Sequence, residues 1–118
     1  MVREIKFKAK RIKNNEWVVG TLIYGNIESV FTEIQAFHDR ELYSIDVNTI
    51  CQLTGIKTSY DIDVYEGDVF AMSKGYYGVV VFDQDNAQFI VNIHRPNGEL
   101  EDTADLPYIA KHYNVKGN

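Results

Sequence analysis

The second half of the chain contains three short runs of strand-forming residues, and turn-forming residues separate them. The runs cover residues 64–72, 76–82 and 88–93. Valine, isoleucine, phenylalanine and tyrosine favour extended backbone, whereas the residues at 73–75 and 83–86 favour turns, so the pattern predicts a meander of two antiparallel hairpins. Residues 95–98, Arg-Pro-Asn-Gly, then predict a tight turn that ends the third strand, because proline presets the backbone for it.

Strong twist and short connections in such a meander are typical of a small barrel. The expected fold class is therefore mainly β, with a β-rich α+β fold possible, built from antiparallel strands with an SH3-like small barrel in the C-terminal half. The chain has 118 residues, 13% aromatic residues and two prolines, which suit one strand-rich domain. We expect a single domain over 1–118, with an N-terminal β-rich part at 1–46 and the barrel part at 47–118.

Strand signals in the first half are interrupted more often. We expect strands over residues 2–10, 17–24 and 42–47, with a turn at 13–15 and a break at 25–26. Residues 27–37 stay open between helix and strand, because their apolar side chains recur at helical spacing but belong to types that strands prefer. We expect the chain to turn within residues 49–55, where Gly55 can adopt a conformation that is costly for other residues.

The strand expected at 76–82 is apolar on both of its faces. Tyr76, Val80 and Phe82 alternate with Tyr77, Val79 and Val81. Such a strand must be covered twice, since an antiparallel sheet with one solvated face alternates apolar and polar side chains. We therefore expect that either the N-terminal half or another subunit packs across it, and a homo-oligomer is the predicted state.

Charge is distributed unevenly along the chain. Residues 1–13 contain six lysines and arginines against Glu4 alone, a net charge of +5, so the total of −5 leaves −10 for the remainder. Lys6, Lys8 and Lys10 alternate with apolar residues, so an extended strand places them on one solvated face, where they also discourage edge-to-edge aggregation. The alternative is a basic arm for nucleic acid, which needs the same clustered lysines.

The apolar runs are short. None exceeds the stretch at 79–82, and the N-terminus alternates charged and apolar residues, so we expect neither a membrane span nor a signal peptide, and a cytoplasmic location. The single cysteine, Cys51, cannot form an internal disulfide, which suits a reducing compartment, and we expect it to be a small buried hydrophobe.

Two motifs connect the chain with a known family. Residues 49–56, Thr-Ile-Cys-Gln-Leu-Thr-Gly-Ile, and residues 64–70, Val-Tyr-Glu-Gly-Asp-Val-Phe, resemble in sequence and spacing the motifs of the YopX-like family of bacteriophage and prophage proteins. Segments 3–7 and 78–82 are similar to further elements of that family, but Tyr60-Asp61 stands where members usually have Asn-Gly.

The resemblance implies a mostly β fold with an SH3-like component, a phage origin, hence the cytoplasm of a bacterial host, and no established biochemical activity. It implies structural roles for the motif residues Thr49, Gln52, Thr54, Gly55, Tyr65, Glu66, Gly67 and Asp68.

Few side chains stand in a pattern that would carry chemistry. Four carboxylates lie within eight residues, at Asp61, Asp63, Glu66 and Asp68. The ligand spacing of a calcium loop is missing, and we expect Asp68 to hydrogen-bond the corner made by Gly67. Each of the three histidines lacks a second ligand at the spacing of a zinc site; they are His38, His94 and His112. We expect no enzyme activity, and no catalytic, cofactor-binding or metal-binding residues.

Two hypotheses on function come from different classes. The first is a phage accessory protein that binds a host or phage protein through sheet edges and exposed aromatic residues, with the candidates Trp17, Tyr76 and Tyr77. The second is a nucleic-acid-binding small barrel, whose basic strand tracks phosphates through Lys6, Lys8 and Lys10. We favour the first, because the acidic remainder of the chain repels nucleic acid.

Overall fold

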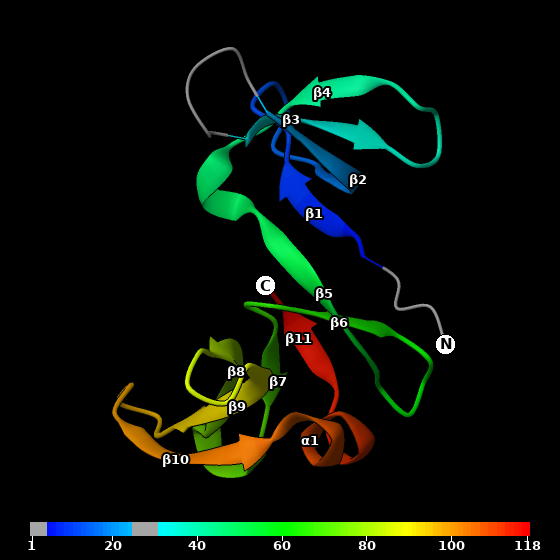
Figure 1. The fold of residues 1–118 in the computed structure, drawn as a ribbon. Helices are drawn as coiled ribbons and strands as arrows, with labels where there is room; N and C mark the ends of the chain where they lie inside the picture. The colour runs from blue at the N-terminus through cyan, green and yellow to red at the C-terminus, as the bar shows by residue number, and fades with distance from the viewer. Residues whose placement is uncertain (1–4, 25–30) are drawn as a thin grey trace. The chain divides into compact units, whose positions relative to one another are not determined.

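The fold is mainly antiparallel β, as the sequence predicted (Figure 1). The computed structural model describes residues 5–24 and 31–118, and α1 is the α-helix within these ranges. The chain divides into two compact units, Met1–Leu53 (unit 1) and Thr54–Asn118 (unit 2). This division lies inside strand β5 (Cys51–Lys57), further along the chain than residue 46, where the two parts were expected to meet.

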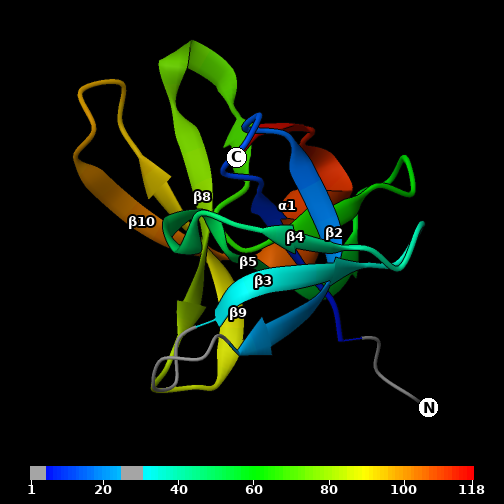
Figure 2. The same cartoon turned by 90° about the horizontal axis from the view of Figure 1, so that it is seen from above.

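Unit 1 is a curled antiparallel meander. Its strands are β1 (Phe7–Lys10), β2 (Trp17–Tyr24), β3 (Phe31–Ala36) and β4 (Leu42–Ser44), followed by the 3-10 helix η1 (Val47–Thr49) and the start of β5. Strands β4, β3 and β2 are neighbours in that order (Figure 2). β1 pairs with β2 on one side and with the first residues of β5 on the other. An isolated bridge between Arg11 and Ile45 brings the two ends of the meander together.

The core of unit 1 comes from alternate residues of these strands. Its buried side chains are Ala9, Val18, Ile34, Ala36 and Ile45. Ala9 lies opposite Val18 in the β1–β2 pair, so both side chains enter the same face of the sheet. The opposite face of β1 carries Lys8 and Lys10, as the alternation in the sequence predicted.

Gly20 sets the closest approach between two strands of unit 1. A Cβ atom built on this residue would lie 1.9 Å from the carbonyl oxygen of Gln35, which belongs to the backbone of β3. Backbone cannot move aside as a flexible side chain can, so β2 and β3 reach this spacing only because position 20 has no side chain.

Unit 2 contains a five-stranded antiparallel sheet in the order β10-β9-β8-β7-β11. Its elements are β6 (Asp63–Tyr65), β7 (Val69–Ala71), the 3-10 turn η2 (Ser73–Gly75), β8 (Tyr77–Asp83), β9 (Gln88–His94), β10 (Leu100–Asp105), α1 (Leu106–His112) and β11 (Val115–Gly117). The small barrel expected here is not closed, because the sheet ends at β10 on one side and at β11 on the other.

Helix α1 stands between these two edge strands in the sequence and completes the core. Leu106, Ile109 and Ala110 are buried with side chains from the sheet, among them Phe70 and Val80. The side chain of Asp105 accepts a hydrogen bond from the backbone N–H of Tyr108 at 3.1 Å, which caps the first turn.

The strand expected at 76–82 is β8, and its two faces differ. Gly78 and Val80 are buried, and Val80 belongs to the core of unit 2, whereas Val79 and Val81 on the other face are half-buried. The self-association inferred from this strand stays a prediction.

Several sequence predictions were wrong in detail. Of the expected turn at 49–55, Thr49 ends the 3-10 helix η1, whereas residues 51–55 lie in the strand β5, in which Gly55 has φ +84°. The reversal after β5 lies at residues 58–62. Strand 64–72 is divided into β6 and β7 by the corner at 66–68, and 42–47 is a strand only as far as Ser44.

The open segment 27–37 is a strand over Phe31–Ala36. Its first residues, the break at 25–26 and residues 2–4 of the strand expected at 2–10 lie outside the described residues. Residues 5 and 6 are described and are not part of a strand, which begins at Phe7. The elements β10, α1 and β11 were not predicted. Within residues 5–24 and 31–118, no helix has the length and apolar character needed to cross a bilayer.

Replacing Gly20 by alanine tests the close approach of β2 and β3. We expect Gly20→Ala to lower the free energy of unfolding by about 3 kcal/mol, because the added methyl forces a backbone shift. Urea denaturation followed by tryptophan fluorescence measures the change. The matched control is Gly117→Ala, whose Cβ meets no atom within 4 Å and should cost under about 0.5 kcal/mol. Equal effects of the two substitutions would contradict the prediction.

Candidate functional site

Two lysines of β1 gather around one exposed tryptophan of β2. Lys10 lies opposite Trp17 in the β1–β2 pair, and Lys8 is two residues away on the same face. The Nζ atoms of Lys8 and Lys10 lie 4.6 and 5.3 Å from a ring centroid of Trp17, which is within the range of a cation–π contact. We call Lys8, Lys10 and Trp17 the basic-aromatic face. The indole is 39% exposed, so a partner can reach it.

Lys6 is not part of the basic-aromatic face. Lys6 precedes β1, and its carbonyl accepts a hydrogen bond from the backbone N–H of Leu53 at 2.9 Å. Lys6 is half-buried, and so are Lys8 and Lys10, whereas the expectation was that all three side chains lie on a solvated face. The hydrogen bond extends the contact between the start of unit 1 and β5, so Lys6 contributes to the packing of the unit.

A second cation–aromatic pair lies at the end of β1. The guanidinium carbon of Arg11 lies 4.3 Å from the ring centroid of Tyr43. The hydroxyl of Tyr43 donates a hydrogen bond to the carboxylate of Asp39, and this bond, with one from the backbone N–H of Glu41, holds the pKa of Asp39 below its ordinary value of 3.8. The same bond raises the pKa of Tyr43, so its ring stays neutral beneath Arg11 at physiological pH.

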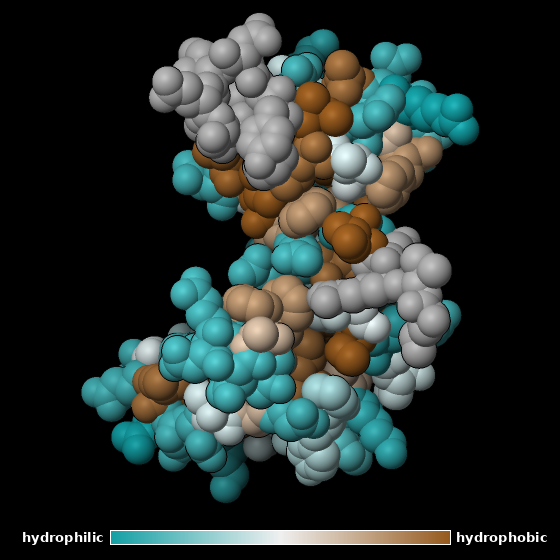
Figure 3. All heavy atoms as spheres, viewed as in Figure 1, coloured by the Kyte–Doolittle hydropathy of each residue, from teal (hydrophilic) through white to brown (hydrophobic). Residues whose placement is uncertain are grey.

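Apolar residues also lie at the surface of unit 1. Figure 3 shows brown, apolar residues over the strands of this unit, next to teal, polar ones. The exposed large apolar side chains of the unit include Ile12, Trp17, Phe37, Leu42 and Val47. Unit 1 therefore exposes large apolar side chains as well as basic ones.

The other aromatic candidates belong to unit 2. Tyr76 follows η2, and its backbone N–H donates to the carbonyl of Ser73 at 3.2 Å. The ring of Tyr77 stacks on that of His94, with centroids 5.1 Å apart and planes 15° apart. Both tyrosines are half-buried. The stacking on His94 gives Tyr77 a role in the local packing of unit 2.

The first family motif contributes hydrogen bonds to the backbone. The hydroxyl of Thr49 accepts from the N–H of Lys10 at 2.8 Å and donates to the carbonyl of Asp46 at 2.6 Å. Gln52 lies opposite Phe7 in the β1–β5 pair. Cys51 is buried, as expected.

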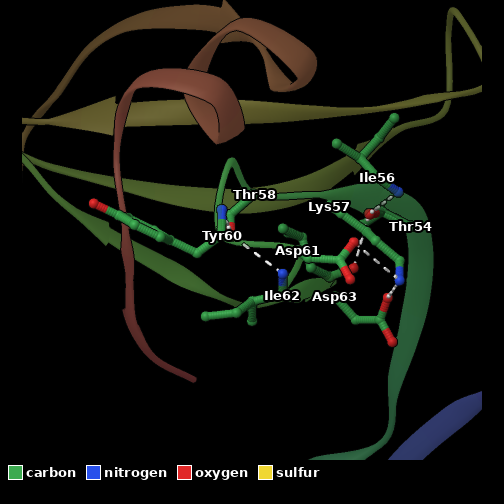
Figure 4. A network of polar contacts seen from close by, with 9 residues as sticks. Thr54, Ile56, Lys57, Thr58, Tyr60, Asp61, Ile62 and Asp63 are labelled. Atoms are coloured by element: carbon green, nitrogen blue, oxygen red, sulfur yellow. Dashed lines mark hydrogen bonds and ion pairs between the residues drawn. The ribbon is translucent and has the colours of Figure 1, made fainter.

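The motif continues into the β5–β6 hairpin, which Figure 4 shows from close by. The hydroxyl of Thr54 donates to the carbonyl of Val64 at 2.8 Å, and Thr58 accepts from the backbone N–H groups of Tyr60 and Ile62. Asp61 takes φ +63°, a left-handed conformation that aspartate tolerates in a turn.

The second motif forms a tight corner around a buried carboxylate. Gly67 has φ +86°, and Asp68, only 3% exposed, accepts a hydrogen bond from the backbone N–H of Tyr65 at 2.8 Å. Its other oxygen accepts from the side-chain amide of Asn118 at 2.8 Å, and that amide also donates to the carbonyl of Glu66 at 3.0 Å. The sequence predicted that Asp68 would bond this corner, and the geometry shows a structural role.

The remaining carboxylates of this region form ion pairs. The Nζ atom of Lys57 lies 3.5 Å from Asp61 and 3.8 Å from Asp63 (Figure 4). In the described parts of the chain, no three or more His, Cys, Asp or Glu side chains are grouped so that they could hold a metal ion. The three histidines contact different neighbours: His38 pairs with Asp39, His94 stacks on Tyr77, and His112 packs on Tyr108.

The chain matches no protein-family model and no curated protein. The resemblance to the YopX-like family therefore stays a prediction that rests on the two motifs.

Removal of the buried carboxylate tests the structural role of Asp68. We expect Asp68→Ala to lower the free energy of unfolding by about 2 kcal/mol, because the backbone N–H of Tyr65 loses its buried partner. The control is Asp61→Ala, whose carboxylate is 86% exposed and whose ion pair with Lys57 is worth about 0.5 kcal/mol or less. Urea denaturation measures both, and a stability of Asp68→Ala equal to that of the control would refute the role.

The hydrogen bond between Tyr43 and Asp39 predicts a specific titration. In Tyr43→Phe the pKa of Asp39 should rise toward 3.8, whereas Tyr60→Phe should leave it unchanged. Because the folded pKa is depressed, the stabilisation by this carboxylate is present above about pH 4 and is lost as the pH falls through the folded pKa. Carbon-detected NMR of the aspartate carboxyl groups measures the shift, and an identical pKa in wild type and Tyr43→Phe would contradict the assignment.

Proposed function

We propose that the chain is a non-enzymatic protein-interaction module that binds an acidic segment of a partner protein through the basic-aromatic face. The observation that carries this proposal is the cluster of two lysine ammonium groups against the exposed indole of Trp17. Tryptophan supplies a large, rigid contact area, and carboxylates of a partner meet two cations that β1 already holds in place.

The position of the face on paired strands supports specific binding. β1 pairs with β2 on one side and with β5 on the other, so Lys8 and Lys10 project from a backbone fixed by hydrogen bonds. Groups held in this way lose less conformational freedom on binding than groups on a mobile loop. A weak electrostatic attraction can then become a defined contact.

Nucleic-acid binding is the second candidate, and the same three side chains favour it, because lysines contact phosphates and tryptophan stacks on bases. The net negative charge of unit 2 disfavours nucleic-acid binding. Residues 54–118 carry five lysines and arginines against ten aspartates and glutamates, whereas residues 1–53 carry seven of each. A nucleic acid carries a negative charge at every phosphate, so this net charge repels it, whereas a short acidic segment brings only a few carboxylates.

The setting of this activity is part of the proposal. On the resemblance to the YopX-like family, the protein acts as a phage or prophage accessory protein in the cytoplasm of a bacterial host, and its partner is a host or phage protein. Self-association through β8 is a further expectation, and light scattering that gives a monomeric mass would exclude it.

Charge reversal on β1 tests the proposed function. Tagged wild-type protein should capture a host or phage protein from lysate whether or not nuclease is added, and Lys8→Glu/Lys10→Glu should reduce the capture at least about tenfold, because the variant repels acidic groups. The control Lys74→Glu/Lys116→Glu makes the same charge change at exposed positions of unit 2 and should bind like wild type.

Two results would contradict the proposal. Equal capture by Lys8→Glu/Lys10→Glu and wild type would exclude the basic-aromatic face as the binding surface. Capture that nuclease abolishes, together with an affinity for DNA or RNA that falls steeply with salt, would establish the second candidate.

A further inference from the structure

We infer that a groove next to the basic-aromatic face receives aliphatic side chains that adjoin the acidic segment of the partner. This inference rests on the proposed function and names the chemistry of the partner more closely. The partner would present a bipartite segment, with carboxylates for Lys8 and Lys10 and aliphatic residues for the groove.

The groove lies where the two ends of the unit 1 meander meet. It has a volume of about 530 Å³, and its lining includes Ile12 from the turn after β1, and Ile45 and Val47 from the segment after β4. The bridge between Arg11 and Ile45 and the hydrogen bond from the N–H of Ile12 to the carbonyl of Ser44, 3.1 Å long, hold its two walls together. The walls are therefore formed in the unbound protein.

The walls of the groove are apolar and accessible. Ile12 is 69% exposed and Val47 is 43% exposed, whereas Ile45 between them is buried in the core. Ile12 precedes the polar turn residues Lys13, Asn14 and Asn15, and its exposed side chain does not contribute to the core of unit 1. Covering Ile12 and Val47 with aliphatic groups of a partner removes apolar surface from water, which favours binding.

The charges around the groove indicate the other half of the segment. Arg11 lines the groove, and its guanidinium lies over Tyr43. Asp46 also lines it, but this carboxylate accepts a hydrogen bond from the backbone N–H of Asn48 at 3.0 Å. Lys10 directly precedes Arg11, and its carbonyl accepts from the N–H of Asp46 at 2.9 Å, so the groove adjoins the lysines of β1. The charged residues of the groove are thus Arg11 and Asp46, and Lys10 and Lys8 precede them along the chain on β1.

This arrangement fits a polypeptide better than a nucleic acid. Nucleic acids have no aliphatic side chains that would fill a groove between isoleucine and valine, whereas a peptide places carboxylates and aliphatic groups within a few residues of each other. The groove also extends the contact area, because the basic-aromatic face alone offers only three side chains.

Binding of two labelled peptides, measured by fluorescence anisotropy on the full chain, tests the inference. One peptide has four glutamates followed by Val-Ile-Val, and the other has four glutamates followed by Ser-Ser-Ser. Wild type should bind the aliphatic peptide about fivefold more tightly, as expected for partial burial of two or three aliphatic groups. Ile12→Ser/Val47→Ser should abolish this preference without changing the affinity for the serine peptide.

The control is Ile62→Ser/Leu100→Ser, which removes two similarly exposed aliphatic residues from unit 2 and should keep the fivefold preference. Wild type that binds neither peptide, equal affinity for both peptides, or a preference that persists in Ile12→Ser/Val47→Ser would overturn the inference. Circular dichroism of each variant verifies that it is folded.

Lys8→Glu/Lys10→Glu separates this inference from the proposed function. If the lysine variant weakens both peptides while the groove variant changes nothing, the basic-aromatic face binds acidic segments and only the groove is excluded. If the lysine variant binds both peptides like wild type, the proposed function itself fails. Binding of an oligothymidylate but of neither peptide would exclude both and favour nucleic acid.

Discussion

β1 is paired on both sides, and this double pairing fixes the direction of every side chain along it. Ala9 lies opposite Val18 inside the core, so Lys8 and Lys10 on either side of it must project from the other face. A slip of one residue would expose Ala9 and bury both lysines, at a large desolvation cost. Thr49 reinforces the register, because its hydroxyl accepts from the N–H of Lys10. The basic-aromatic face is thus a consequence of how the core of unit 1 packs.

The corner at residues 66–68 of unit 2 turns the chain sharply while its buried polar groups stay hydrogen-bonded. Gly67 takes a positive φ, and the carboxylate of Asp68 bonds both the N–H of Tyr65 and the amide of Asn118. A further hydrogen bond joins this corner to β8, because the N–H of Gly67 donates to the carbonyl of Val80 at 2.8 Å. In this chain, Gly67 and Asp68 therefore specify the corner between β6 and β7.

The sequence predicted those features that depend on neighbouring residues. Strand β2 follows from its run of strand formers, the direction of Lys8 and Lys10 follows from alternation, and the bond made by Asp68 follows from its place beside Gly67. Helix α1 was missed because seven residues are too few to establish a 3.6-residue period. β10 was missed because its residues are mostly polar.

Contacts between distant residues could not be inferred from one sequence. The approach of Gly20 to the carbonyl of Gln35, and the groove between Ile12 and Val47, depend on how separate strands come together. The same holds for Trp17, which the sequence marked as an aromatic candidate but did not join to the lysines. Only the register between β1 and β2 places the indole beside them.

The acidic edge strand β10 of unit 2 opposes pairing between two copies of the protein. β10 ends the five-stranded sheet, and an edge strand offers its outer backbone groups to any passing chain. Glu101, Asp102 and Asp105 lie along it, so two such edges repel each other before their backbones can pair. The sheet can therefore stay open at β10 without offering that edge as a template for fibrils.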